Sequence, residues 1–162
     1  MAKGMTRREA REAAFALLFE TEFQPERPPE DIYALATEDR DLEENEYVRR
    51  AYYGVMEKRE EIDGLIGKYS GNWKTERLSR VSRAALRLAV YEMLYCDDIP
   101  ASVSINEAIE LTKKFDDPRA RSFVNGVLNA VKNDIEDNAG AKKEKKDADT
   151  PAAPTPSEEE RA

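Results

Sequence analysis

The chain has 162 residues, of which 37% are charged and 40% hydrophobic, and its formal net charge is −8. This length suffices for one domain that buries about two-thirds of its unfolded surface, so no disulfide or metal is needed for folding. Cys96, the single cysteine, excludes an intrachain disulfide, and no apolar run approaches the roughly 18 residues of a membrane span. No secretory signal precedes the first predicted helix, so we expect a cytoplasmic protein with no membrane segment, cofactor or metal.

The acidic charge is concentrated in two segments. Residues 26–46 hold nine acidic and two basic side chains, and residues 137–162 hold seven acidic and five basic ones. The remaining residues carry a net charge of +1. The overall charge therefore does not exclude nucleic acid as a partner, because the helical body is close to neutral.

The first predicted helix begins at a capping box, Thr6-Arg-Arg-Glu9, in which each of the two end side chains accepts the other's backbone N–H. Cations crowd its first turn, although each one there opposes the helix dipole by about 0.3–1 kcal/mol. A solvated helix end and an anion-binding site both fit this pattern, since free N–H groups and arginine forks suit phosphate. The cations are Lys3, Arg7, Arg8 and Arg11.

The middle of the chain predicts helices separated by breaks. Residues 24–41 hold three prolines and predict a loop around one short helix. Residues 43–69 predict a long helix that bends or ends near Gly64, because glycine costs about 1 kcal/mol relative to alanine there. Trp73 follows in a break and is expected in the core.

Residues 78–95 predict the most buried helix, because two apolar stripes leave only a narrow polar strip. The strip carries Arg80, Arg83 and Arg87. Ion pairs with the acidic loops are the favoured interpretation of these arginines, and phosphate binding is the alternative.

Two more capped helices are predicted before the tail. Ser104-Ile-Asn-Glu107 fits a capping box, which predicts a helix start at Ser104. Asp117 and Pro118 predict a second start, with aspartate as the cap and proline at the first helical position. Residues 138–162 contain no Leu, Ile, Val or aromatic residue, so we expect residues 137–162 to form a disordered tail.

Residue types that support catalysis are scarce in this sequence. The chain has no histidine, which removes the commonest general base, and it has neither a phosphate-cradling Gly-rich loop nor a G-x-S-x-G motif. Cys96 therefore has no histidine to activate it. We do not expect an enzyme.

Four sequence blocks together resemble the NusB family of bacterial transcription antitermination factors. They are TRREAREAAFALLFE, NWKTERLSRVSRAALRLAVYEML, INEAIEL and FVNGVL, in that order within residues 5–135. The resemblance implies an all-α fold of about seven helices in two packed three-helix bundles, which would span residues 1–136. The N-terminal bundle would occupy about 5–70 and the C-terminal bundle about 71–136, with the tail outside both.

The resemblance also implies a function. Proteins of this family bind the single-stranded boxA element of nascent ribosomal RNA together with NusE, a small-subunit ribosomal protein, in the antitermination complex of RNA polymerase. Phe19 and Ser82 lie on the side implicated in NusE binding, where many members have tyrosine and an acid. Phe123 could stack a base and equally fits a core position. The RNA-binding positions carried over are Lys3, Arg7, Arg8, Arg11, Ser122 and Phe123.

Two other interpretations stay open on the sequence alone. The chain could be a helical interaction module, monomeric or homodimeric, that buries its arginine-rich turn against the acidic segment 26–46 of a partner. It could also be a detached RNA-targeting domain, similar to the one that precedes the catalytic domain of some ribosomal RNA cytosine methyltransferases.

Overall fold

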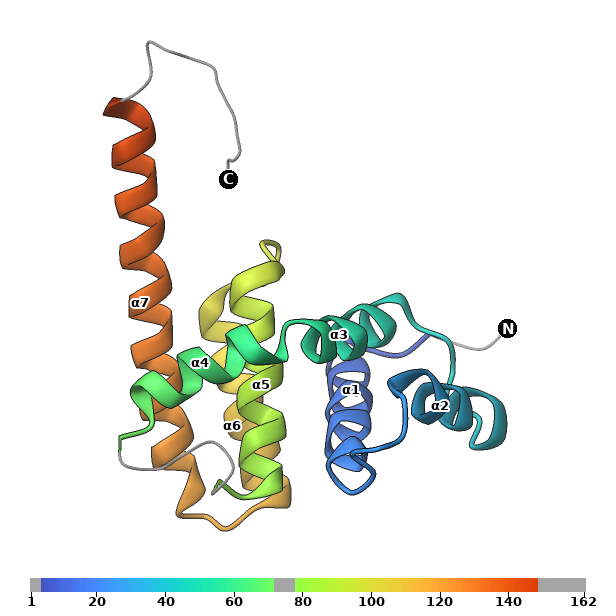
Figure 1. Cartoon of the computed structure of the whole chain (residues 1–162). Coiled ribbons are helices and arrows are strands. Elements are labelled where there is room, and N and C mark those ends of the chain that lie inside the picture. The colour runs from blue at the N-terminus through green and yellow to red at the C-terminus, as the bar shows by residue number, and fades with distance from the viewer. Residues whose placement is uncertain (1–3, 72–77, 149–162) are drawn as a thin grey trace.

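The computed structural model describes residues 4–71 and 78–148, and for residues 139–148 only the course of the backbone. Within these ranges the chain forms seven α-helices and one π-helical turn, and no strand (Figure 1). The predicted all-α fold is confirmed. Lys3, Trp73 and residues 149–162 lie outside the described residues.

The N-terminal group of helices is built around α1. This helix contacts α2, α3 and α5, and a π-helical turn, Leu35–Asp39, extends α2. Its capping box is confirmed, because Thr6 Oγ1 accepts the Glu9 N–H at 3.0 Å and Glu9 Oε1 accepts the Thr6 N–H at 2.9 Å. The members of the group are α1 (Arg7–Glu22), α2 (Pro29–Ala34) and α3 (Glu46–Glu57).

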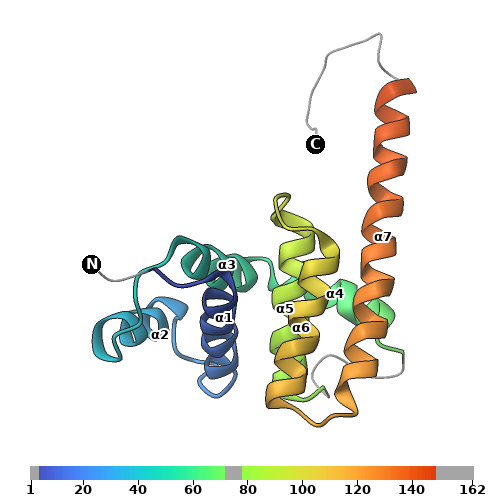
Figure 2. The same ribbon diagram turned by 180° about the vertical axis from the view of Figure 1, so that it is seen from behind.

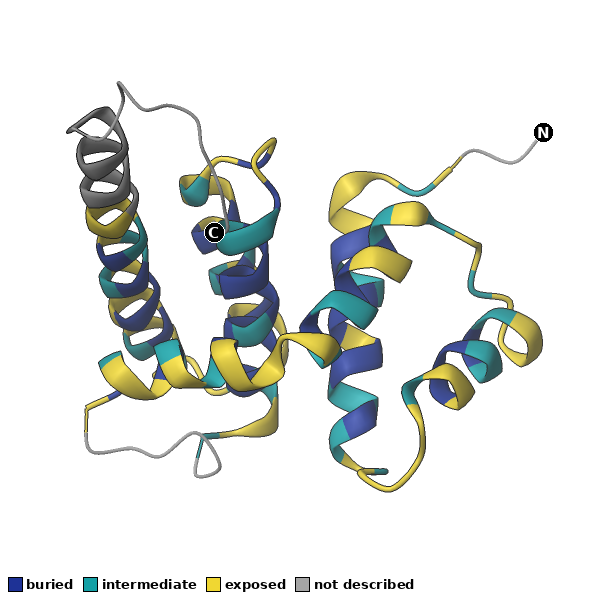
Figure 3. Ribbon diagram, turned by 45° about the horizontal axis from the view of Figure 1, so that its top comes forward, coloured by how far each residue is buried: buried dark blue, intermediate teal, exposed yellow. Residues whose placement is uncertain are grey.

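The C-terminal group of helices is built around α5, which contacts α1, α3, α4, α6 and α7. Figure 2 shows α5 and α6 side by side between α1 and α7. Buried residues follow the inner faces of these helices (Figure 3), because each apolar stripe packs against its neighbours. The members are α4 (Arg59–Tyr69), α5 (Arg80–Tyr95), α6 (Ala101–Phe115) and α7 (Ala120–Ala148).

The predicted long helix over residues 43–69 is wrong in one respect. The chain breaks at Lys58 and not at Gly64, which lies inside α4. Tertiary packing explains the position of the break, because α3 packs against α1 and α5 while α4 turns to pack against α5 and α7. α4 therefore contacts α3, α5 and α7.

The predicted helix start at Ser104 is also wrong. α6 begins at Ala101 with Pro100 as its N-cap, and Ser104 is buried inside the helix. Pro100 has φ −60°, so the helix can begin directly after it. The Ser104 hydroxyl instead donates to Glu92 Oε1 at 2.7 Å. The residues of the capping-box pattern therefore serve tertiary contacts and not a helix cap.

The start and the end of α7 differ from the sequence-based boundaries. The helix begins at Ala120, after a turn in which Asp117 Oδ1 accepts the Arg119 N–H at 2.8 Å. It continues to Ala148, beyond residue 136 (Figure 1). Residues 137–148 contain alanine, lysine and glutamate, which have high intrinsic helix propensity, so this extension does not depend on apolar packing.

Two glycines allow a matched test of the packing between α3 and α5. A Cβ at Gly54 would lie 2.4 Å from the ring of Tyr91, whereas a Cβ at Gly64 would meet nothing within 4 Å. We expect Gly54→Ala to lower the free energy of unfolding by about 1–2 kcal/mol, because overpacking of about 1–3 kcal/mol outweighs the helix propensity gained. Gly64→Ala should raise it by about 0.5–1 kcal/mol. Urea denaturation measures both, and an equal gain at the two sites would contradict the close contact.

Candidate nucleic-acid interface

The first turn of α1 presents two exposed arginines. The guanidinium of Arg7 lies 5.2 Å from the ring centre of Tyr47, the second residue of α3. A cation over an aromatic face at this distance is attracted to it, so Tyr47 restricts the arginine without covering it. The two residues that follow the Thr6 cap have backbone N–H groups with no helical acceptor, which adds positive potential.

Arg8 turns toward α6 and binds Glu107 through both branches of its fork. Arg8 Nε lies 3.1 Å from Glu107 Oε1, and Arg8 Nη2 lies 2.8 Å from Oε2. These hydrogen bonds hold the pKa of the Glu107 carboxyl below its usual value. The side chain of Arg8 is nevertheless 69% exposed, so a ligand in solvent can reach it.

Arg11 lies in the interior, although it follows Arg8 by less than one helical turn. It is only 4% exposed, and its Nε donates to Glu92 Oε2 at 2.7 Å. Glu92 is fully buried and also accepts hydrogen bonds from the hydroxyls of Tyr47 and Ser104. Burial first, and then the Glu92 carboxylate, raise the pKa of Tyr47, so its hydroxyl stays a donor. Arg11 is therefore held mainly by Glu92 and is almost wholly shielded from solvent.

The buried cluster of Arg11, Tyr47, Glu92 and Ser104 joins four helices, namely α1, α3, α5 and α6. Sequence analysis did not identify Glu92 as important. The available signal was its position as a carboxylate among the apolar residues of the helix predicted to be most buried, since a buried charge is normally paired.

Ser122 and Phe123 lie in the first turn of α7. Ser122 is exposed, while Phe123 is half-buried and packs against the core. Figure 1 shows α7 beginning at the lower end of the helical body, whereas α1 begins at its upper end. The structure therefore separates the predicted RNA-binding residues into two places.

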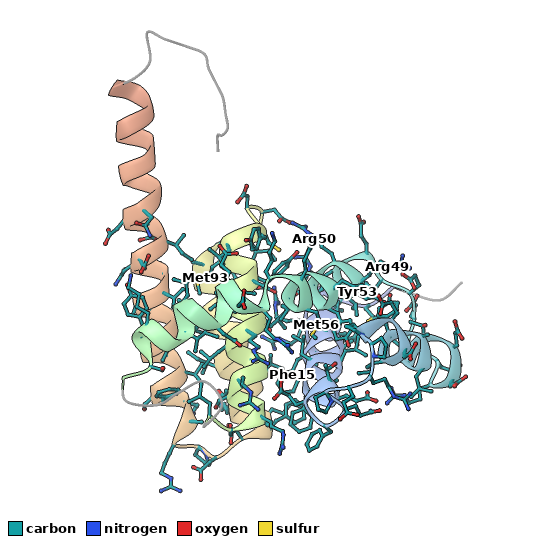
Figure 4. The ribbon with its side chains drawn as sticks, viewed as in Figure 1. Phe15, Arg49, Arg50, Tyr53, Met56 and Met93 are labelled. Carbon is teal, nitrogen blue, oxygen red and sulfur yellow. The ribbon has the colours of Figure 1, made fainter. Side chains whose placement is uncertain are left out.

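An aromatic row runs along α1 to the end of α6. Phe15, labelled in Figure 4, stacks on Phe115 with ring centres 5.4 Å apart and on Phe19 at 6.2 Å. Phe19 meets Phe23 edge to face at 5.1 Å. We call these four phenylalanines the aromatic row. Both ends of the row reach solvent, since Phe23 is 55% and Phe115 45% exposed.

Ser82, the other predicted partner-binding residue, is buried near this row. Its hydroxyl donates to Asp116 Oδ2 at 2.8 Å, and the Ser79 hydroxyl donates to the same oxygen at 2.6 Å. Ser82 therefore positions the turn between α6 and α7 and does not itself face solvent.

Two of the three arginines of α5 form ion pairs, as predicted, but with partners outside the acidic loops. Arg83 and Arg87 bind Glu22 at the end of α1, and Arg87 Nη2 also lies 2.8 Å from Asp63 Oδ2 in α4. Burial opposes ionisation of Glu22, yet Arg87 and Arg83 hold its pKa below the usual value. These acids belong to helices α1 and α4 and not to the segment 26–46. Arg80 lies over the ring of Phe23 at 4.6 Å.

Comparison with known proteins decides the family. The sequence model described as the NusB family matches residues 8–133. The chain belongs to the NusB family. It is 48% identical over 133 residues to the transcription antitermination protein NusB of Bacillus velezensis, a match that covers 82% of this chain and 99% of that protein. No helix among the described residues is long and apolar enough to cross a membrane.

Solved structures of NusB proteins share this fold. NusB of T. maritima superposes with a TM-score of 0.73 at 36% identity, covering 81% of this chain and 93% of that one. A crystal structure of the antitermination factors NusB and NusE in complex with double-stranded RNA matches with a TM-score of 0.70 at 29% identity. That match covers 78% of this chain and 96% of the solved one.

Breaking the buried Arg11–Glu92 pair tests its role in this NusB-family fold. Glu92→Gln keeps the shape of the side chain but replaces one of the two accepting oxygens with an NH2 donor and leaves Arg11 without its buried carboxylate, so we expect a loss of about 3–5 kcal/mol in the free energy of unfolding. Arg11→Met combined with Glu92→Gln should lose less than the two single changes added together. Thermal and urea denaturation measure these effects.

The control is Arg8→Met. It removes the same positive charge as Arg11→Met, but from an exposed position three residues before Arg11, and should leave the free energy of unfolding unchanged. If Glu92→Gln were as stable as this control, the pair would not hold the four helices together.

Proposed function

We propose that this protein is a transcription antitermination factor that binds single-stranded boxA RNA of nascent ribosomal transcripts together with NusE, in the antitermination complex of RNA polymerase. The observation that supports this best is the pair of exposed forks, Arg7 and Arg8, on the N-terminus of α1 in a NusB-family chain. The role is one of binding, without catalysis, and it belongs in the cytoplasm, where such transcripts are made.

RNA phosphates are the proposed ligands of the first turn of α1. Guanidinium forks match the geometry of phosphate oxygens, and the positive end of the helix dipole favours the same anion. Cations at this position disfavour the isolated helix, so an anionic ligand accounts for their presence better than stability does. Arg11 contributes indirectly in this proposal, because its ion pair with Glu92 fixes the helix that carries Arg7 and Arg8.

A second RNA contact is proposed at the first turn of α7, through Ser122 and Phe123. Single-stranded RNA is commonly read by stacking unpaired bases on aromatic rings. Phe123 is only half-buried, so part of its ring is free for such stacking. One strand of RNA would bind both ends of the helical body, in line with the separate positions of the two contacts.

The aromatic row is the proposed NusE surface. Protein interfaces are enriched in aromatic side chains, and Phe19 lies in the middle of a row whose outer rings reach solvent. Ser82 contributes to this surface indirectly, because its hydroxyl holds Asp116 in the turn next to Phe115.

RNA binding through the first turn of α1 is tested with Arg7→Ala plus Arg8→Ala. About four neutralised phosphates predict a fifty-fold loss of affinity between 50 and 200 mM salt, at a slope of roughly 0.7 per contact. Losing two contacts should reduce this loss to about sevenfold and weaken binding at low salt by at least tenfold. Fluorescence titration of boxA RNA, single-stranded and double-stranded, with and without NusE, measures both quantities.

Arg59→Ala is the matched control, since Arg59 is an exposed arginine on α4. Equal losses in the control and the double variant would contradict a localised site, and wild-type protein that binds no RNA even with NusE would refute the proposed function.

Phe123 and Phe19 allow the two proposed surfaces to be separated. Phe123→Leu keeps an apolar side chain for the core, so the free energy of unfolding should change by less than about 1.5 kcal/mol. Loss of the ring should weaken RNA binding by about 1–3 kcal/mol if one base stacks there. Phe19→Leu should instead weaken NusE binding and leave RNA binding by the chain alone unchanged. Calorimetry with each partner distinguishes the two, and equal effects of both variants on RNA would argue against separate surfaces.

A further inference from the structure

A groove between α1 and α6 lies beside the proposed RNA surface. Its volume is about 330 Å³, and both basic and acidic side chains line it. On α6 it is lined by Lys113, Lys114, Leu111 and two glutamates, and on α1 by Glu12 and the two arginines that follow Arg7. The groove therefore has the charges of an anion site, with carboxylates already inside it.

Glu107 occupies the position that an external anion would take at Arg8. Its two oxygens accept from Nε and Nη2 of Arg8 at 3.1 and 2.8 Å, which is the fork geometry that arginine also offers to phosphate. The two side chains differ in exposure, since Glu107 is 15% and Arg8 69% exposed. An anion from solvent can reach the arginine without first entering the protein interior.

Arg11 provides a second, independent indication of a ligand. Arg11 lines the same groove and is more than nine-tenths buried. Nη1 lies 3.8 Å from Glu107 Oε1, beyond hydrogen-bond distance, and Nη2 is buried with no hydrogen-bond partner among the described residues. A buried donor without an acceptor is unfavourable, so the groove retains hydrogen-bonding capacity that Glu107 does not use.

We propose that this groove is a phosphate subsite for the RNA and that Glu107 is its internal competitor. In the free protein the Glu107 carboxylate holds Arg8, and an RNA phosphodiester group displaces the carboxylate and takes over the hydrogen bonds of the fork. Glu107 thereby disfavours RNA that makes few other contacts, because such RNA cannot offset the free energy of the lost Arg8–Glu107 ion pair. The inference rests on the proposed function, since RNA is the source of the phosphate.

Glu107→Gln tests the competition, because glutamine has the same shape and no charge. We expect the affinity for boxA RNA to rise by up to about fivefold, the worth of one exposed ion pair. The salt dependence should change little, since an RNA phosphate pairs with Arg8 in both proteins and releases the same counterion from the RNA. Unchanged or weaker binding by Glu107→Gln would overturn the proposal.

Two further variants separate competition from a general change of charge. Glu110→Gln removes the same charge from the next turn of α6 in the same groove and should strengthen binding less. In an Arg8→Ala background, Glu107→Gln should have no effect, because the pair is already broken. An equal gain in either control would show that only the summed charge matters and would refute a role for the Arg8–Glu107 pair.

Inorganic phosphate provides a readout that does not depend on RNA binding. In NMR titrations of the full chain, the Nε–H resonance of Arg8 should shift at lower phosphate concentration in Glu107→Gln than in the wild type. If the wild type bound no RNA while this difference appeared, the proposed function would fail and the phosphate subsite would stand. If RNA bound but phosphate shifted Arg8 equally in both proteins, the competition would be refuted and the function would stand.

Discussion

One fully buried carboxylate, Glu92, determines how the helices of this protein meet. Its two oxygens accept hydrogen bonds from Arg11, Tyr47 and Ser104, which come from α1, α3 and α6, while Glu92 itself lies on α5. A buried charge is tolerated only when it is paired and hydrogen-bonded, so these helices must approach one another at this point. Apolar attraction is not directional, whereas a hydrogen-bonded charge cluster requires each donor at a fixed position.

The same cluster determines which arginines of α1 face solvent. Arg11 is held inside by Glu92, and this orients the preceding turn so that Arg7 lies over Tyr47 and Arg8 faces α6. The first two turns thus contain one ion pair in the interior and one ion pair at the rim of a groove. Only the second can exchange its carboxylate for another anion without unfolding, because Arg8 is largely exposed.

The sequence correctly predicted the features of the fold that depend on interactions between neighbouring residues. The Thr6 capping box, the short helix within residues 24–41 and the apolar stripe of α5 need only neighbouring residues, and the structure has the corresponding helices. The errors occur where distant residues decide. Ser104 fits a cap but is recruited by Glu92, and the break at Lys58 follows from the packing of α3 and α4. Arg11 is one of the basic residues at the start of α1, and nothing near it in the sequence shows that it pairs inside the protein with a carboxylate 81 residues away.

A single rigid helix, α1, carries both proposed surfaces. Its first turn presents the arginines, and its last turns present Phe19 and Phe23, which continue through Phe15 to the α6–α7 turn at Phe115. Ion pairs from Arg83 and Arg87 to Glu22 hold the last turn against α5, as Glu92 holds the first turn. With both ends fixed, α1 offers little movement to transmit a signal between the surfaces. Cooperation between RNA and NusE on this helix would then arise from contacts between the two ligands, because the helix itself has no second arrangement to select.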